Sequence, residues 1–137
     1  MIRAKLCFVA EGIIRDADNN TISAFTLIEG LGAAGFPLFL QRLSFFALWL
    51  RDTEDPRQIG AHFRVNLGNT ILNETRLRLD FIDQLKTRTV IHLQGLVVPQ
   101  PGLLDFHMEL EDGSNVDYSL EVTQTAPVVA PQVVAHQ

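Results

Sequence analysis

Apolar side chains recur at every second residue along much of the chain, and no other feature constrains the fold as strongly. In IGAHFRVNL, residues 59–67, the apolar residues fall on one face, whereas His62, Arg64 and Asn66 fall on the other. A period of two is typical of a strand with one buried and one solvated face. We therefore expect a fold built from half-buried β-strands.

The same alternation marks three further segments, which are TRLRLDF (75–81), LLDFHMEL (103–110) and VDYSLEV (116–122). The last two flank the sequence Glu111-Asp112-Gly113-Ser114. Gly113 can supply the positive φ that a tight connection between antiparallel strands requires. This pattern predicts a β-hairpin.

The segment RLSFFALWLRD, residues 42–52, is apolar on both faces. A helix of this length is the alternative, but the aromatic neighbours and the flanking Gly and Pro favour a strand. A strand of this kind lies in the centre of a covered sheet or has its outer face against another subunit. The interface candidates that it supplies are Phe46, Leu48, Leu50 and Trp49.

About eight such strands can be drawn, and no long helix. They include TVIHLQGLVV (89–98), which ends at prolines that cannot donate to a strand ladder. We expect residues 32–37 to form a loop. The predicted fold is all-β, an antiparallel β-sandwich of immunoglobulin-like or jelly-roll type.

A chain of 137 residues has the length of one domain. We expect a single sandwich over residues 1–125 and an extended tail over residues 126–137, APVVAPQVVAHQ, because two prolines interrupt it and no charged residue occurs in it. Its apolar pairs could add to a sheet edge or lie in a groove of a neighbouring molecule. They are Val128, Val129, Val133 and Val134.

The charge balance argues against some partners. The net charge is −5, so nucleic acid is not an expected partner. No apolar segment approaches the about 20 residues of a membrane-spanning helix, and the run Leu6–Ala10 is too short for a signal peptide. The single cysteine, Cys7, fits a reducing compartment. We expect a cytoplasmic protein without a membrane partner.

The segment DADNNT, residues 16–21, raises the question of a calcium loop, because Asp16, Asp18 and Asn20 alternate. An EF-hand loop needs Gly at its sixth position and Glu at its twelfth, where this chain has Thr21 and Leu27. The strand-like flanks, residues 4–14 before it and 21–31 after it, favour the tip of a hairpin instead. The calcium interpretation would require the carboxylates of residues 52–55 to converge on the same end of the sandwich.

The stretch from Cys7 through DADNNTISAFTLIEGL to Gly35-Phe36-Pro37 resembles the N-terminal signature of a small bacterial family of uncharacterised β-sandwich domains. Members open with a Cys-bearing strand, turn through an Asp/Asn/Gly hairpin and reach a Pro before a long apolar strand. The resemblance covers about the first 50 residues well and the closing hairpin loosely. It implies the fold, but no activity and no site residues.

Motifs for catalysis or cofactor binding are missing from the sequence. The histidines His62, His92 and His107 have no ligand partner at short spacing, and neither G-x-S-x-G nor a glycine-rich phosphate loop occurs. Cys7 lies among apolar residues, where a thiol is unreactive. We expect no enzyme, no cofactor and no metal, with Asp16, Asp18 and Asn20 as the weak metal candidates.

A basic strip is conceivable if the strands that carry its five residues are neighbours. Such a strip could face the acidic hairpin 105–117 of another copy, although a solvated sheet surface is the simpler interpretation. The five residues are Arg64, Arg76, Arg78, Lys86 and Arg88.

Two functions remain open at this stage. The first is a non-enzymatic interaction or assembly module that forms a homo-oligomer or binds another protein, using strand 42–52 and the tail. The alternative is a sandwich that binds a small ligand, a carbohydrate or a lipid, on aromatic side chains. Those side chains would be Phe45, Phe46, Trp49 and Tyr118.

Overall fold

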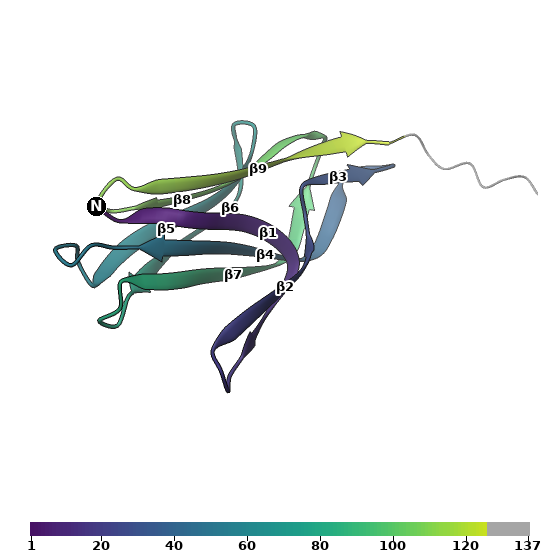
Figure 1. Ribbon diagram of the computed structural model, residues 1–137. Coiled ribbons are helices and arrows are strands. Elements are labelled where there is room, and N and C mark those ends of the chain that lie inside the picture. Colours follow the sequence, from purple (N-terminus) through teal and green to yellow (C-terminus); the bar gives the residue numbers. More distant parts are fainter. Residues whose placement is uncertain (126–137) are drawn as a thin grey trace, which may run out of the picture.

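The computed structural model describes residues 1–125, which form two packed β-sheets without a helix (Figure 1). The predicted all-β sandwich is confirmed. The described residues contain nine strands, namely β1 (Arg3–Asp16), β2 (Thr21–Leu27), β3 (Gly30–Ala33), β4 (Leu38–Leu50), β5 (Gln58–Leu67), β6 (Thr70–Asp80), β7 (Lys86–Val98), β8 (Gly102–Leu110) and β9 (Asn115–Gln124).

Four strands form one sheet, in the order β2-β1-β4-β7, and five form the other, in the order β3-β9-β8-β5-β6. All neighbours pair antiparallel except β3 and β9, which pair parallel. The acidic hairpin and the β5–β6 hairpin therefore lie side by side in the same sheet, because β8 pairs with β5.

The core lies between the sheets and is rich in aromatic side chains. Phe45 of β4 reaches across to the other sheet, with its ring centroid 4.9 Å from that of Phe63 and 6.4 Å from that of Phe106. All three side chains are fully buried. Tilted and offset aromatic pairs add to the area-based stabilisation. This contact between β4, β5 and β8 joins the two sheets at their centre.

Two sequence predictions about local structure are confirmed. Residues 42–50 belong to strand β4, not to a helix. The β8–β9 hairpin closes with hydrogen bonds from Leu110 N to Ser114 O (2.7 Å) and from Gly113 N to Leu110 O (2.9 Å). Gly113 has the predicted positive φ, 91°.

The prediction of a continuous strand to Leu31, followed by a loop, is wrong. Strand β2 ends at Leu27, and the chain then crosses to the other sheet as β3. Ile28 fixes the crossing point, because its N–H donates to Val9 O (2.8 Å) and its carbonyl accepts a hydrogen bond from the Tyr118 hydroxyl (2.6 Å). Long-range bonds of this kind leave no signal in the local sequence.

The two long strands β4 and β7 change the phase of their alternation together. Leu40 pairs with Leu96 and Leu43 pairs with Leu93, and all four pack in or against the core, although the two leucines of each strand are three positions apart. Gly95, between Leu93 and Leu96, has a φ of 70°, which is favourable for glycine alone. Strict alternation therefore fails at this point.

We predict that Phe63→Ala lowers the free energy of unfolding by about 3–5 kcal/mol, because it leaves a cavity at the contact between the sheets. Phe39→Ala is the matched control, since Phe39 is 63% exposed, and its effect should stay within about 1 kcal/mol. Denaturant unfolding measures both values. Equal losses would contradict the assigned core.

Candidate interaction surface

Strand β4 presents apolar side chains to both sides of its sheet, as predicted. Phe45 and Trp49 point into the core and are 0% exposed. Phe46 is buried too, at 3% exposure, but it belongs to the outer side and is not part of the core cluster. Leu48 and Leu50 are half-buried on that outer side. The prediction of Trp49 as an interface residue is therefore wrong, because the opposite sheet covers this side chain.

The neighbouring strands extend the outer side of β4 into an apolar surface. Residues that lie directly opposite in a sheet project to the same face. Phe46 pairs with Phe8 of β1 and Val90 of β7, and Leu48 pairs with Leu6 of β1. The Phe8 and Phe46 rings stack with centroids 4.8 Å apart. We define the apolar face by six residues, Leu6, Phe8, Phe46, Leu48, Leu50 and Val90.

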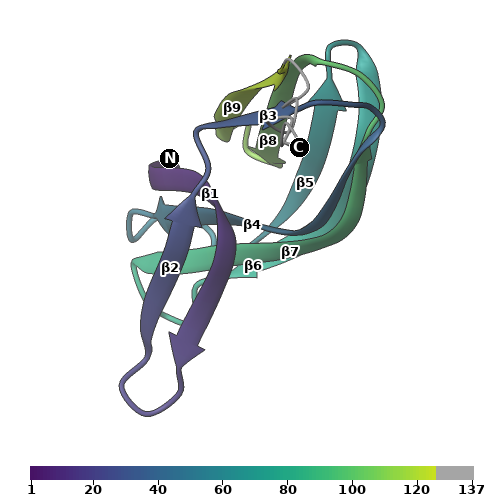
Figure 2. The same cartoon turned by 90° about the vertical axis from the view of Figure 1, so that its right-hand side faces the viewer.

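The apolar face continues onto a β-hairpin that separates from β4 after Ala10. Strand β1 pairs with β4 up to Ala10 and with β2 from Ala10 onward. We call residues 10–27 the arm. Figure 2 shows the arm standing away from the rest of the two sheets. It exposes large apolar side chains, with Ile14 at 60%, Leu27 at 57% and Phe25 at 38% exposure.

A glycine and an aromatic ring fit together on the arm. Gly12 pairs with Phe25, whose ring lies so close that a Cβ at residue 12 would be 2.1 Å from Phe25 Cζ. The Arg42 guanidinium lies over the same ring, 5.7 Å from its centroid. Phe25 therefore packs against the base of the arm although its edge is exposed.

Basic side chains of β7 flank the apolar face on one side. Lys86 and Arg88 of β7 pair with Leu50 and Leu48 and are exposed. His92 also lies on this side, with Nδ1 2.9 Å from the hydroxyl of the buried Ser44. In the described chain, residues 42–50 of β4 and 86–94 of β7 include no Asp or Glu, and Glu11 of β1 forms an ion pair with Arg42 (4.0 Å) at the base of the arm.

The conceivable basic strip is divided between the two sheets. Arg64 of β5 and Arg76 and Arg78 of β6 lie on the outer side of the five-stranded sheet. Lys86 and Arg88 belong to the other sheet. The arginines of β5 and β6 share their face with the acidic hairpin of the same chain, because β5 lies between β6 and β8. That face is solvated and carries both signs of charge.

The histidines do not converge. His62 lies 3.2 Å from the Glu74 carboxylate, His107 contacts Asp117, and His92 is on the opposite sheet. Within residues 1–125 no group of three or more His, Cys, Asp or Glu side chains could hold a metal ion.

The segment DADNNT forms the tip of the arm. Asp18 N donates to Asp16 Oδ1 (2.9 Å), and the Thr21 hydroxyl donates to Asn19 Oδ1 (2.8 Å), as in side-chain-stabilised turns. The carboxylates of residues 52–55 follow β4 at the other end of β1, where Arg3 pairs with Leu50. They do not meet Asp16, Asp18 and Asn20, so the condition set for the calcium interpretation is not fulfilled.

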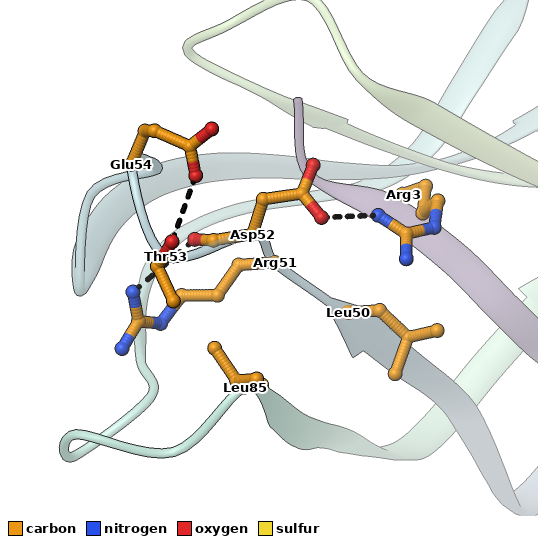
Figure 3. A pocket seen from close by; sticks show the side chains of 7 residues that line it. All are labelled: Arg3, Leu50, Arg51, Asp52, Thr53, Glu54 and Leu85. Carbon is orange, nitrogen blue, oxygen red and sulfur yellow. Dashed lines mark hydrogen bonds and ion pairs between the residues drawn. The ribbon is translucent and has the colours of Figure 1, made fainter.

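A hollow lies where β4 leads into the turn toward β5 (Figure 3). Its wall is built on Arg51, which is 7% exposed and donates from Nε to Gln84 O (2.8 Å) and from a terminal nitrogen to Asp55 O (3.2 Å). Arg51 therefore ties the turn to the β6–β7 loop, and its role here is structural. The lining residues are Arg3, Leu50, Arg51, Asp52, Thr53, Glu54 and Leu85.

The aromatic residues of the ligand-binding alternative lie in different parts of the structure. Phe45 and Trp49 are core residues, and Phe46 lies under Phe8. Tyr118 packs against the core and donates its hydroxyl to Ile28. None of the four lines the hollow of Figure 3.

The remaining interface candidates, Val128, Val129, Val133 and Val134, lie outside the described residues. Six contributors to the surface were missed from the sequence, namely Leu6, Phe8 and Val90 of the apolar face and Ile14, Phe25 and Leu27 of the arm. The signal for the first two was present, because Leu6 and Phe8 have the same parity on β1 and neither is charged. Only the strand order shows that they lie beside Phe46.

Comparison of the chain with protein-family models, with curated proteins and with solved structures finds no significant match in any of the three. The resemblance to a bacterial family of β-sandwich domains therefore stays a prediction. Among residues 1–125, no helix is long and apolar enough to cross a membrane.

We predict that Gly12→Ala destabilises the chain by about 1–3 kcal/mol, because the new methyl group overlaps the Phe25 ring. Phe25→Ala should remove most of this cost, so that the effects in the double variant are not additive. Denaturant unfolding of both single variants and the double variant gives the coupling. Additive effects would contradict the contact.

Burial and the negative charge of Asp117 raise the pKa of the Cys7 thiol to about 12. At pH 8, Cys7 should react with iodoacetamide about 100- to 1,000-fold more slowly in the folded chain than in denaturant, since the thiolate is the nucleophile. An unfolded thiol ionises near pH 9. Stability should therefore decrease between about pH 9 and 12, and less so in Cys7→Ala. Equal alkylation rates in both states would show that the thiol is accessible.

Proposed function

We propose that this chain is a non-enzymatic β-sandwich module that forms homo-oligomers through the apolar face. The observation that carries the proposal is the continuous outward surface of β1, β4 and β7. Large contiguous apolar patches are uncommon on monomers and mark contact sites. Leu6 is 50% exposed on β1, at the edge of this surface, and Leu48 and Leu50 of the central strand β4 are half-buried.

A second copy is the partner that we propose. In a two-fold contact each copy covers the same apolar residues of the other, so both faces are removed from water together. Lys86 and Arg88 stay at the rim of this contact, where they are accessible to solvent and to carboxylates that can pair with them. Another protein with an apolar surface is the alternative partner.

The chemistry of the side chains supports a role without catalysis. The Cys7 thiol is held in its neutral form, and His62 and His107 each contact one carboxylate on the outer side of a sheet. The ligand-binding alternative has less support, because Phe45 and Trp49, on which it depends, are in the core. With a net charge of −5 and a reduced cysteine, we place the module in the cytoplasm, away from nucleic acid.

The test is the mass of the chain in solution, by size-exclusion chromatography with light scattering at about 1–100 µM. We expect the natural chain to exceed the 15.3 kDa of one copy. Leu6→Glu and Leu48→Glu should each return it to that mass, because a buried unpaired charge opposes association. Leu103→Glu, at a site 55% exposed on the outer side of the other sheet, should leave the mass unchanged.

Melting temperatures show that each variant folds. A natural chain that is a monomer throughout this range would contradict the proposal, and so would dissociation by Leu103→Glu alone. A chain that ends at Gln124 separates the roles of face and tail. The face alone is sufficient if the shortened chain keeps the oligomeric mass.

A further inference from the structure

Within residues 1–125, the arm leaves large apolar side chains exposed on its outward side. From Gly12 to Asp16 strand β1 pairs only with β2 in this part of the chain, and Ile14, Phe25 and Leu27 are exposed. An isolated two-stranded hairpin is marginally stable in water. A surface that packs against the arm would therefore stabilise it.

The length of the arm matches the surface that it would cover. Strand β1 advances by six positions from Ala10 to Asp16 in the arm and by seven positions from Arg3 to Ala10 beside β4. At about 3.3 Å per residue, both segments are about 20 Å long. The arm of one copy can thus span the apolar face of another from one end to the other.

Charged residues indicate which end of the apolar face the tip of the arm would reach. The tip of the arm carries Asp16 and Asp18, and neither forms an ion pair within the described residues. Lys86 and Arg88 are likewise without a carboxylate within 4.0 Å in that part of the chain. Lys86 of β7 pairs with Leu50 of β4, and Leu50 pairs with Arg3 of β1. Arg3 lies seven positions before Ala10, where the arm begins.

We propose that two copies exchange their arms. The outward side of each arm, with Ile14 and Phe25, lies on the apolar face of the partner, and the carboxylates of Asp16 and Asp18 lie beside Lys86 and Arg88 of the other copy. This inference rests on the proposed function, since it names the mode of the same association. The contact is reciprocal, so each dimer contains two such charge clusters.

Charge reversal tests the exchange. The variant D16K/D18K places cations against cations in both contacts, and K86E/R88E places anions against anions. We expect each variant alone to dimerise at least about tenfold more weakly than the natural chain, because like charges across an interface oppose association. Sedimentation velocity of the full chain measures the dissociation constants.

Mixing the two variants gives the sharper result. In a mixed dimer the lysine tip of D16K/D18K meets the glutamates of K86E/R88E, and the natural tip of the second copy meets the natural Lys86 and Arg88 of the first. We expect the mixture to dimerise within about threefold of the natural chain. The control variant R76E/R78E, on the outer side of the other sheet, should dimerise normally, and melting curves should show that all variants fold.

Other outcomes separate the two proposals. If both reversed variants dimerise as the natural chain does while Leu6→Glu dissociates it, the apolar face forms the dimer without exchange, and this inference is wrong. If the mixture does not recover affinity, the tip and Lys86/Arg88 are not opposite each other, which overturns the inference as well. If the natural chain is a monomer, the proposed function fails too.

Discussion

The two-sided apolar character of β4 is the constraint on which the rest of the structure depends. A strand of this kind needs cover on both faces, because burial of apolar surface is the main favourable term in folding. The opposite sheet covers one face through Phe63 and Phe106. On the other face, Phe46 stacks with Phe8 and is 3% exposed, whereas Leu48 and Leu50 are half-buried. The sandwich therefore covers the inward face of β4 completely, and on the outward face Leu48 and Leu50 remain partly exposed.

The distribution of charge follows the same division. The outer side of the five-stranded sheet carries acids and bases on adjacent strands, as expected of a solvated surface. The outward paired positions 42–50 of β4 and 86–94 of β7 carry no carboxylate in the described chain and hold apolar and basic residues together with Ser44 and Gln94. In an acidic protein this is an uneven distribution, and it gives one face a chemistry suited to a partner with apolar contacts and carboxylates.

The sequence was sufficient to predict which segments form strands and which residues share a face of each strand. The order in which the strands pair and the sheets pack could not be predicted. Alternation placed Phe45 and Trp49 together opposite Phe46, and the structure agrees. Parity does not say which side faces the core, which is why Trp49 was included among the interface candidates. The answer depends on residues of β5 and β8, which lie far away in the sequence.

Contacts between residues far apart in the sequence also explain the other two differences between the predicted and the observed fold. The crossing at Ile28 depends on a hydroxyl 90 residues later, that of Tyr118. The arm was predicted as a hairpin with DADNNT at its tip. Its separation from β4 was not predicted, and it follows from the end of the β1–β4 pairing at Ala10. Contacts between distant segments set both features, and a local pattern contains no record of them.

The central claim is that the outward side of β1, β4 and the arm is covered by a second copy. Amide hydrogen exchange of the natural chain at two concentrations, one below and one above the dissociation constant, tests it directly. The account predicts that exchange across residues 10–27 slows as the concentration rises, while the β5–β6 hairpin is unchanged. Rapid exchange in the arm at every concentration, with no difference between the two samples, would contradict it.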